Sequence, residues 1–164
     1  MPNAPSLKIR RFRESDLGPL LRLIHETIDV SYGAVYPPRA VDFFKTFHSE
    51  QKILARSETG TVLVIEEEGA LTATGSIVEG EIFAVFVDPR FQKGGRGRVL
   101  MLALEDEARA QGVTESELSV SLPSLPFYRG LGYAVVEERS RDVGEGQRLD
   151  FWKAKKRLVA SNSD

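Results

Sequence analysis

The segment Val87-Asp88-Pro89-Arg90-Phe91-Gln92-Lys93-Gly94-Gly95-Arg96-Gly97 joins a hydrophobic stretch to a stretch with helical spacing, and it contains three glycines. Before it, residues 82–87 are aromatic, β-branched or alanine, which predicts a buried strand that ends at Asp88-Pro89. After it, hydrophobic residues recur at helical spacing from Val99 to Gln111, and Gly112 marks the end. The glycines therefore lie where a strand leads into the N-terminus of a helix.

This junction has the properties of an anion-binding site. The first N–H groups of a helix have no partner within the helix, and the helix dipole adds partial positive charge there. The three glycines have no Cβ to keep a phosphate from the backbone. The basic side chains beside them are Lys93, Arg96 and Arg98. The alternative is a flexible turn on the surface, which a glycine cluster alone does not exclude.

Two common phosphate-binding loops do not fit the spacing of these glycines. The chain has no Gly-Lys-Ser or Gly-Lys-Thr, which a P-loop needs, and Gly95-Arg96-Gly97 lacks the third glycine of a Rossmann loop. The segment Gln92-Lys93-Gly94-Gly95-Arg96-Gly97 does match the pattern Gln/Arg-x-x-Gly-x-Gly/Ala. In this it resembles the acetyl-CoA signature of the GCN5-related N-acetyltransferases (GNAT), which hold the coenzyme A pyrophosphate on this loop.

A second segment carries the same resemblance. Phe127-Tyr128-Arg129-Gly130-Leu131-Gly132-Tyr133 is similar to the Phe-Tyr-x-x-x-Gly-Phe/Tyr element of the family. The residues between the two segments are enough for a helix over 97–111 and a short strand over 117–121, where hydrophobic and polar residues alternate. This agrees with the spacing of the two motifs. Ser121 and Ser124 stand where many members carry Asn and Ala.

The remaining segments complete one α/β unit. A strand from Leu7 to Arg13 precedes a helix that Ser15 is expected to cap, and after a loop a second helical region begins at Pro38. Further strands are expected over 61–67, 71–78, 133–138 and 149–154, with a tight turn at Glu68-Gly69-Ala70 and a short helix through Tyr128. The order β-α-α-β-β-β-α-β-α-β-β predicts a mixed, mostly antiparallel sheet flanked by helices. The resemblance implies the same GNAT-like, acyl-CoA N-acyltransferase fold.

Composition is consistent with a single domain. The chain has 164 residues, of which 41% are hydrophobic and 28% charged, with no break that indicates a linker. One domain over 1–164 is expected, with an ordered core at about 6–158. The absence of cysteine excludes disulfides, thiolate metal sites and cysteine nucleophiles, and a net charge of -2 gives no general attraction to nucleic acid or anionic membrane. The chain has neither a hydrophobic membrane span nor a signal-peptide pattern, so a cytoplasmic location is expected.

The resemblance implies how acetyl-CoA would lie. Its phosphates would rest on residues 92–97, and its pantetheine arm would follow Val85, Phe86 and Val87. In the family this strand splays from a parallel neighbour, here 117–121, whose Ser121 is a further candidate contact. The Val87 N–H is then the candidate donor to the thioester oxyanion, a contribution worth about 3 kcal/mol of barrier. The alternative is an ordinary ladder hydrogen bond.

Tyr128 occupies the position at which many members of the family have a tyrosine that protonates the departing coenzyme A thiolate. An unperturbed phenol pKa of about 10 keeps this group protonated at neutral pH. Packing in the core, with a hydrated hydroxyl, is the alternative.

Glu81 and Glu79 are the candidate bases for the incoming amine. Both lie at the start of the central strand, where Glu81 shares strand parity with Val85 and Val87. Two glutamates beside a glycine are also typical of a solvated turn. His25 and His48, the only histidines, are expected in structural or surface positions, and no metal site is expected.

Tyr32 and Tyr36 are the candidate contacts for the acceptor, because they lie in the loop between the first two helical regions. Phe43, Phe44 and Phe47 follow that loop and are expected mostly in the core. The resemblance places the acceptor side of the site in this region.

Three functions remain open. The first is an N-acetyltransferase that transfers acetyl from acetyl-CoA to a primary amine by direct attack in a ternary complex. The second is a non-catalytic acyl-CoA-binding sensor or regulatory module, and the third is an interaction domain on a degenerate scaffold. The expected partner is a small-molecule or peptide amine, with neither nucleic acid nor membrane, and the family alone suggests a homodimer.

Overall fold

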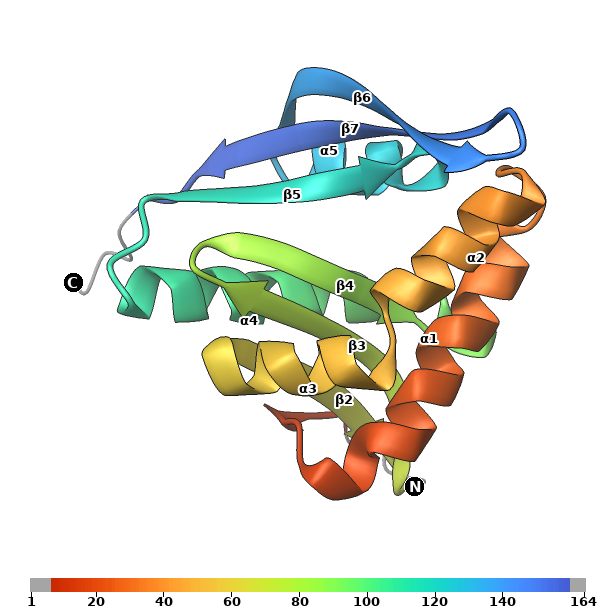
Figure 1. The fold of residues 1–164 in the computed structure, drawn as a ribbon. Coiled ribbons are helices and arrows are strands. Elements are labelled where there is room, and N and C mark those ends of the chain that lie inside the picture. Colours follow the sequence, from red (N-terminus) through yellow and green to blue (C-terminus); the bar gives the residue numbers. More distant parts are fainter. Residues whose placement is uncertain (1–6, 160–164) are drawn as a thin grey trace.

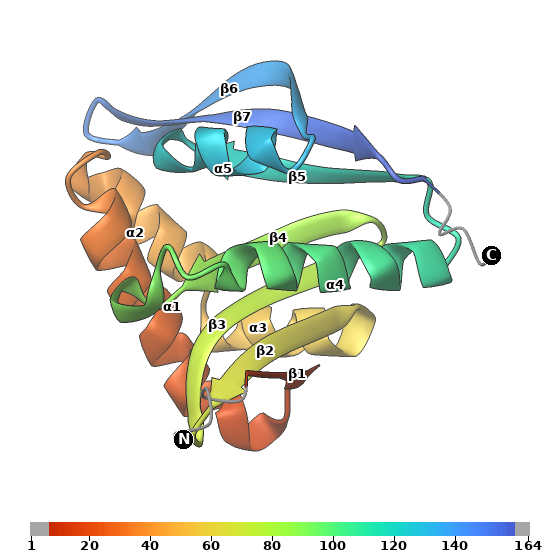
Figure 2. The ribbon, with the colours of Figure 1, turned by 180° about the vertical axis from the view of Figure 1, so that it is seen from behind.

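The computed structural model describes residues 7–159, which form a seven-stranded sheet with helices on both faces (Figures 1 and 2). The strands are β1 (Lys8–Arg11), β2 (Thr61–Glu67), β3 (Ala70–Val78), β4 (Glu81–Val87), β5 (Glu115–Ser121), β6 (Ala134–Gly144) and β7 (Gln147–Arg157). The helices are α1 (Leu17–Tyr32), α2 (Pro38–Phe47), α3 (Glu50–Thr59), α4 (Arg96–Ala110) and α5 (Leu125–Gly130). The ends of the expected domain, 1–6 and 160–164, lie outside the described residues.

The strand order is β1-β2-β3-β4-β5-β7-β6, and every neighbouring pair is antiparallel except β4 and β5. The predicted mixed, mostly antiparallel sheet is therefore confirmed. Three Glu-Gly pairs form the hairpin turns. Their φ angles are 50° and 81° at Glu68-Gly69, 49° and 82° at Glu79-Gly80, and 53° and 70° at Glu145-Gly146. Positive φ at both central residues is the geometry of type I′ turns, which match the twist of antiparallel strands.

Two expectations about the N-terminal helices were wrong. The region after Pro38 contains two helices, because the Ser49 side chain accepts a hydrogen bond from the Lys52 N–H at 3.3 Å and starts α3. Ser15 does not cap α1 but lies in a 3₁₀ turn, which the Asp16 carboxylate stabilises by accepting from the Arg13 N–H at 2.8 Å. Three helices therefore precede β2, rather than two.

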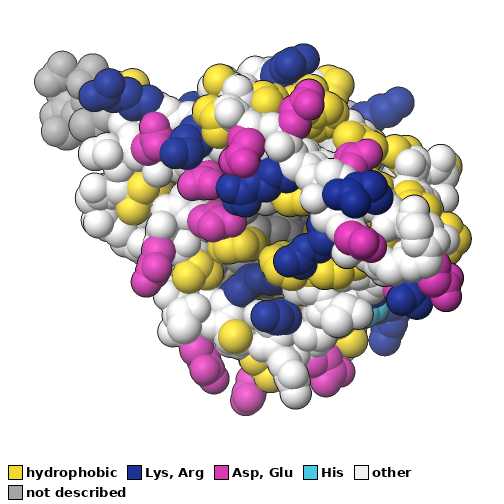
Figure 3. All heavy atoms as spheres, turned by 45° about the horizontal axis from the view of Figure 1, so that its top comes forward, with side chains coloured by type: hydrophobic (Ala, Val, Ile, Leu, Met, Phe, Trp, Pro, Cys, Tyr) yellow, Lys and Arg dark blue, Asp and Glu magenta, His cyan; other side chains and the backbone are white. Residues whose placement is uncertain are grey.

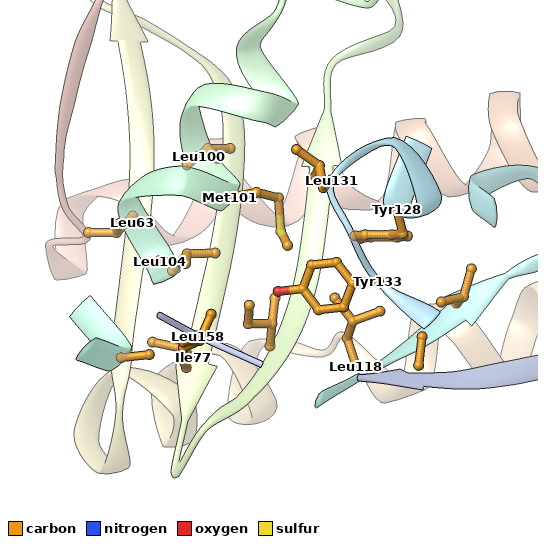
Figure 4. Close-up of a cluster of buried hydrophobic side chains, with 14 of the residues drawn as sticks. Leu63, Ile77, Leu100, Met101, Leu104, Leu118, Tyr128, Leu131, Tyr133 and Leu158 are labelled. Carbon is orange, nitrogen blue, oxygen red and sulfur yellow. The ribbon is translucent and has the colours of Figure 1, made fainter. Parts of the chain in front are cut away.

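Each face of the sheet has its own hydrophobic core. On one face, α4 and α5 lie together (Figure 2), and the cluster around Leu100, Met101 and Leu104 packs against the strands (Figure 4). On the other face, Leu20, Ile24 and Ile28 of α1 form a hydrophobic stripe and are almost fully buried. Burial of each such side chain contributes about 1.5–3 kcal/mol, so both layers are firmly attached to the sheet.

The sheet opens between β4 and β5. These parallel strands pair only at their beginnings, where Glu81 is opposite Glu117 and Ile82 is opposite Leu118. Beyond these residues the two strands separate, so that β1–β4 form one part of the sheet and β5, β7 and β6 the other (Figure 1). The neighbour and the splay are those that the resemblance implies.

Candidate active site

A bulge interrupts β4 beside this opening. The register with β3 passes from Ser76 opposite Phe83 to Thr74 opposite Phe86, so Ala84 and Val85 together face Gly75. Ala84 has a φ of 55°, a left-handed conformation that L-residues seldom adopt.

The bulge changes which side chains share a face. Val85 and Val87 pack in the core on the α4 side, whereas Phe86 and Ala84 pack on the α1 side. After the bulge it is the odd-numbered residues that face α4, whereas before it the even-numbered Ile82 does. Glu81, next to Ile82, therefore points to the other face. The predicted shared parity of Glu81 with Val85 and Val87 is therefore wrong.

The Val87 N–H faces the opening. The next residue, Asp88, donates its N–H to the Thr72 carbonyl at 2.9 Å. Successive N–H groups along a strand point to opposite sides, so the Val87 N–H points away from β3 and toward the space that β5 has left. On that side the Gln92 side chain donates to the Val87 carbonyl at 3.1 Å.

The glycine loop presents backbone donors at the start of α4. Gly95 is the N-cap residue, with a φ of 83°, and Lys93 has a φ of 66°. The first helical hydrogen bond of α4 runs from the Val99 N–H to the Gly95 carbonyl at 3.0 Å. The N–H groups of residues 96–98 therefore make no hydrogen bond within the helix. They point toward the loop, as in anion sites at helix N-termini. Residues 92–95 are exposed.

The Arg96 side chain was expected to offer its charge to an anion at the loop, but it is paired within the protein. Its guanidinium donates to the two carboxylate oxygens of Glu67 at 2.6 and 2.8 Å and to the Phe91 carbonyl at 3.0 Å. The Arg96 hydrogen bonds lower the pKa of Glu67. Because the charge of Arg96 is neutralised by Glu67, its side chain fixes the loop rather than adding charge for a ligand. Among residues 7–159, the positive charge at the loop that has no carboxylate partner comes from Lys93 and Arg98.

On the α1 and α2 side, a cavity of about 660 Å³ lies along the opening. Figure 3 shows the molecule hollowed near the middle of the face it presents, with basic, acidic and hydrophobic side chains around the hollow. The predicted residues that line the cavity are Tyr32, Glu81, Val85, Phe86, Ser121 and Tyr128. The structure thus brings together candidates from α1, β4, β5 and α5.

Tyr128 belongs to the buried cluster on the α4 side of the sheet (Figure 4), and it also lines this cavity. It is buried, with 8% of its surface exposed, and its hydroxyl has no hydrogen-bond partner among residues 7–159. Burial raises the pKa of Tyr128 well above its ordinary value. The phenol is therefore protonated across the physiological range and free to donate.

The two glutamates are in different surroundings. Glu81 lines the cavity, and its carboxylate lies 3.4 Å from the Lys153 ammonium, which is also 3.2 Å from the Ser119 hydroxyl. Glu79 is exposed in the hairpin turn and does not line the cavity. Of the two candidate bases, only Glu81 is at the site.

Tyr36 also lies outside the cavity, contrary to the expectation for the acceptor site. Its hydroxyl donates to the Asp150 carbonyl and accepts from the Leu122 N–H, both at 2.8 Å, so it fastens the loop after α1 to the end of β5 and to β7. Burial raises the pKa of Tyr36 to about 12. The hydroxyl is fully used in this structural role.

Several cavity residues were not predicted. Phe43, Phe44 and Phe47 of α2 line the cavity, and His48 joins them. Phe43 and Phe44 also pack against the α1-side core, as expected for most of these aromatics. Arg139 and Arg141 enter the lining from β6, a strand predicted to end at residue 138. The alternation of Glu137, Arg139 and Arg141 could have indicated that the three side chains share one face of the sheet. An exposed charged strand gives the same pattern, so it does not by itself predict a cavity.

Residues 32–146 match the family model described as an acetyltransferase (GNAT) domain. The chain belongs to the GNAT family of acetyltransferases. It is 30% identical over 147 residues to a glucosamine 6-phosphate N-acetyltransferase from Trypanosoma brucei brucei, with 86% of this chain and 98% of that protein covered. This GNAT protein is accordingly an acyltransferase enzyme of the acetyltransferase type, and the GNAT fold is confirmed.

Solved structures of other GNAT proteins have the same fold. A GCN5-related N-acetyltransferase from Rhodopseudomonas palustris gives a TM-score of 0.83 at 20% identity, over 95% of this chain and 97% of that chain. The PaiA N-acetyltransferase of Thermoplasma acidophilum, solved with coenzyme A, gives 0.75 at 20% identity over 93% and 99%. Among the described residues, no helix is long and hydrophobic enough to cross a membrane.

Proposed function

We propose that this GNAT acetyltransferase transfers an acetyl group from acetyl-CoA to a primary amine by direct attack in a ternary complex. The observation that carries the proposal is the opening between β4 and β5, which has the glycine loop at one end and the cavity with Tyr128 and Glu81 alongside. The donor and the acceptor would therefore meet from opposite faces of one sheet. The chain contains no cysteine that could carry the acetyl group.

The donor would bind mainly through the backbone. The N–H groups of residues 92–98 would hold the pyrophosphate, with Lys93 and Arg98 adding charge and Arg96 fixing the loop through Glu67. The pantetheine arm would follow Val85, Phe86 and Val87, with Ser121 across the opening. There the Val87 N–H would stabilise the oxyanion that forms when the amine attacks the thioester carbonyl.

The acceptor must lose a proton before it can attack, and the leaving thiolate must gain one. Glu81 would accept the proton from the ammonium, directly or through a water molecule. The amine nitrogen then forms a bond to the carbonyl carbon, the carbon–sulfur bond breaks, and Tyr128 donates its proton to the coenzyme A thiolate. The nitrogen loses its second proton, through water, to the Tyr128 phenolate, which leaves the amide, the free thiol and a neutral phenol. The raised pKa of Tyr128 keeps the phenol protonated, so a proton is in place beside the sulfur when the carbon–sulfur bond breaks.

The test compares wild type with Tyr128→Phe. Turnover of acetyl-CoA with a panel of primary amines is measured as release of the free coenzyme A thiol. We expect kcat to fall about 100-fold in Tyr128→Phe, the lower end of general acid catalysis, with acetyl-CoA affinity unchanged. Tyr133→Phe is the matched control: it removes a buried hydroxyl outside the cavity, so it should lower stability through the lost Glu105 hydrogen bond and leave kcat unchanged. Saturable binding of acetyl-CoA with no turnover on any amine would indicate the acyl-CoA-binding module instead.

A further inference from the structure

We propose that the acceptor of this acetyltransferase carries an anionic group, a carboxylate or a phosphate, and that Arg141 binds it at the α2 end of the cavity with Arg139 alongside. This inference rests on the proposed function, because it names the class of amine that the same site accepts.

Three alternating residues of β6 face the cavity. Glu137, Arg139 and Arg141 all line it and follow one another at two-residue steps of about 7 Å, and Ser140, between the two arginines, lines it as well. In the register with β7, Arg139 is opposite Phe151 and Arg141 is opposite Leu149, which also line the cavity. The strand therefore places both guanidinium groups on the acceptor face rather than on the face with α4.

The charges of these residues are not balanced. The Arg139 guanidinium lies 2.9 Å from the Glu137 carboxylate, so this pair is neutral. Arg141 has no carboxylate partner among residues 7–159, and its guanidinium lies over the Phe43 ring at 4.7 Å. Stacking on an aromatic ring holds a guanidinium in place while its N–H groups stay free to bond. The result is an oriented, uncompensated cation in the wall of the cavity.

The opposite charge lies elsewhere in the same cavity. Glu81 projects from β4, on the far side of the opening from β6 in the strand order. An acceptor with an ammonium group and an anionic group matches this distribution, with the amine at Glu81 and Tyr128 and the anion at Arg141. A polyamine or another purely cationic acceptor would place positive charge against Arg141, which is unfavourable.

The coenzyme A phosphates do not account for Arg141. Their proposed site is the loop at the start of α4, which has its own cations in Lys93 and Arg98. Arg141 contacts Phe43 of α2, and α2 lies on the other face of the sheet from α4 (Figures 1 and 2).

The first test compares matched pairs of amines at saturating acetyl-CoA. The pairs are glucosamine 6-phosphate with glucosamine, for phosphate, and phenylalanine with phenylalaninamide, for carboxylate. We expect wild type to show at least a 10-fold higher kcat/KM for the anionic member of one pair, which identifies the anion. Arg141→Gln is expected to lose about 10- to 100-fold on that member, mainly through KM, as for a charge-assisted hydrogen bond. Its activity on the neutral member should not change.

Arg157→Gln is the matched control, because Arg157 is exposed at the end of β7 and does not line the cavity. Equal activity on both members of each pair in wild type would overturn the proposal, as would an equal loss on both members in Arg141→Gln.

A second measurement is independent of turnover. Inorganic phosphate is titrated calorimetrically into the protein saturated with coenzyme A, which fills the loop site. We expect saturable binding in wild type that is lost in Arg141→Gln and kept in Arg157→Gln. Absence of phosphate binding, or binding that survives Arg141→Gln, would contradict the anion site. A protein that binds no coenzyme A would instead contradict the proposed function.

Discussion

Glu81 and Glu79 belong to the same hairpin but have different surroundings. The same substitution at Glu79 is therefore a control for the substitution at Glu81. Glu81 lines the cavity beside Lys153, whereas Glu79 is exposed in the turn. If Glu81 takes the proton of the amine, Glu81→Gln should lower kcat about 100-fold at neutral pH. Raising the pH should restore part of the rate, because more of the amine is then already neutral. Glu79→Gln should retain wild-type kcat, and an equal loss in both variants would exclude Glu81 as the base.

His48 makes the stability of the protein sensitive to acid. Its imidazole is 6% exposed, and burial, with Arg56 and His25 adding to the effect, lowers its pKa to about 3. In the unfolded chain the pKa of histidine is about 6.5, so below that pH the unfolded state binds a proton that the folded state does not. The contribution of neutral His48 is therefore complete above pH 6.5 and is lost as the pH falls toward 3.

We expect this protonation to remove about 2 kcal/mol of the free energy of unfolding between pH 7.5 and pH 5. His48→Gln cannot titrate, so its stability should fall less over the same range. Urea unfolding followed by the single tryptophan, Trp152, measures both. A stability difference between wild type and His48→Gln that is the same at both pH values would show that His48 is not held neutral.

The loop at the start of α4 depends on an ion pair from outside its own segment. Glu67 at the end of β2 accepts two hydrogen bonds from Arg96 and one from Thr72. Glu67→Gln would leave Arg96, whose side chain is 18% exposed, without its partner. Because this pair is not completely buried, we expect a loss of about 2–3 kcal/mol, below the 3–5 kcal/mol of a fully buried pair.

Acetyl-CoA affinity should fall together with stability in Glu67→Gln, since the N–H groups of the loop would no longer be held in position. Chemical unfolding and calorimetric titration give the two quantities. Glu68→Gln, at an exposed position in the next turn, is the control and should change neither. Unchanged acetyl-CoA affinity in Glu67→Gln would mean that the ion pair does not position the loop.

The glycine loop and α4 could be predicted from sequence, because their pattern is local. The Ala84 bulge could not, since its left-handed conformation is imposed by pairing with β3 and alanine gives no sign of it. Likewise, nothing local indicates that Arg96 is paired with Glu67, which is 29 positions away. The Arg139 and Arg141 pattern is visible in the sequence, but only the packing of α2 on this face turns an exposed strand into a cavity wall.

The two parts of the opened sheet are joined on the α4 side by a buried polar cluster. Glu105 of α4 is fully buried and accepts hydrogen bonds from Lys156 of β7 and from the Tyr133 hydroxyl, both at 2.9 Å. The Tyr133 hydroxyl also lies 2.8 Å from the Ser116 hydroxyl of β5. The whole molecule therefore keeps a gap between β4 and β5 while α4 bridges the two sides.

Lys156→Met should destabilise the protein by about 3–5 kcal/mol, because it leaves the Glu105 charge buried without its cation. The double variant Lys156→Met/Glu105→Gln should recover part of that loss, since a neutral amide costs less to bury. Urea unfolding of both variants provides the comparison. A loss below 1 kcal/mol in Lys156→Met would contradict the role of this cluster in joining the two parts.

Calorimetric titration with acetyl-CoA tests the proposed donor site most directly. We expect saturable binding of one acetyl-CoA per chain, weakened at least 10-fold in Lys93→Glu, where a cation beside the loop becomes an anion. Lys52→Glu makes the same change of charge at an exposed position on α3 and should leave binding unchanged. No saturable binding in wild type, or equal affinity in wild type and Lys93→Glu, would contradict the site described above.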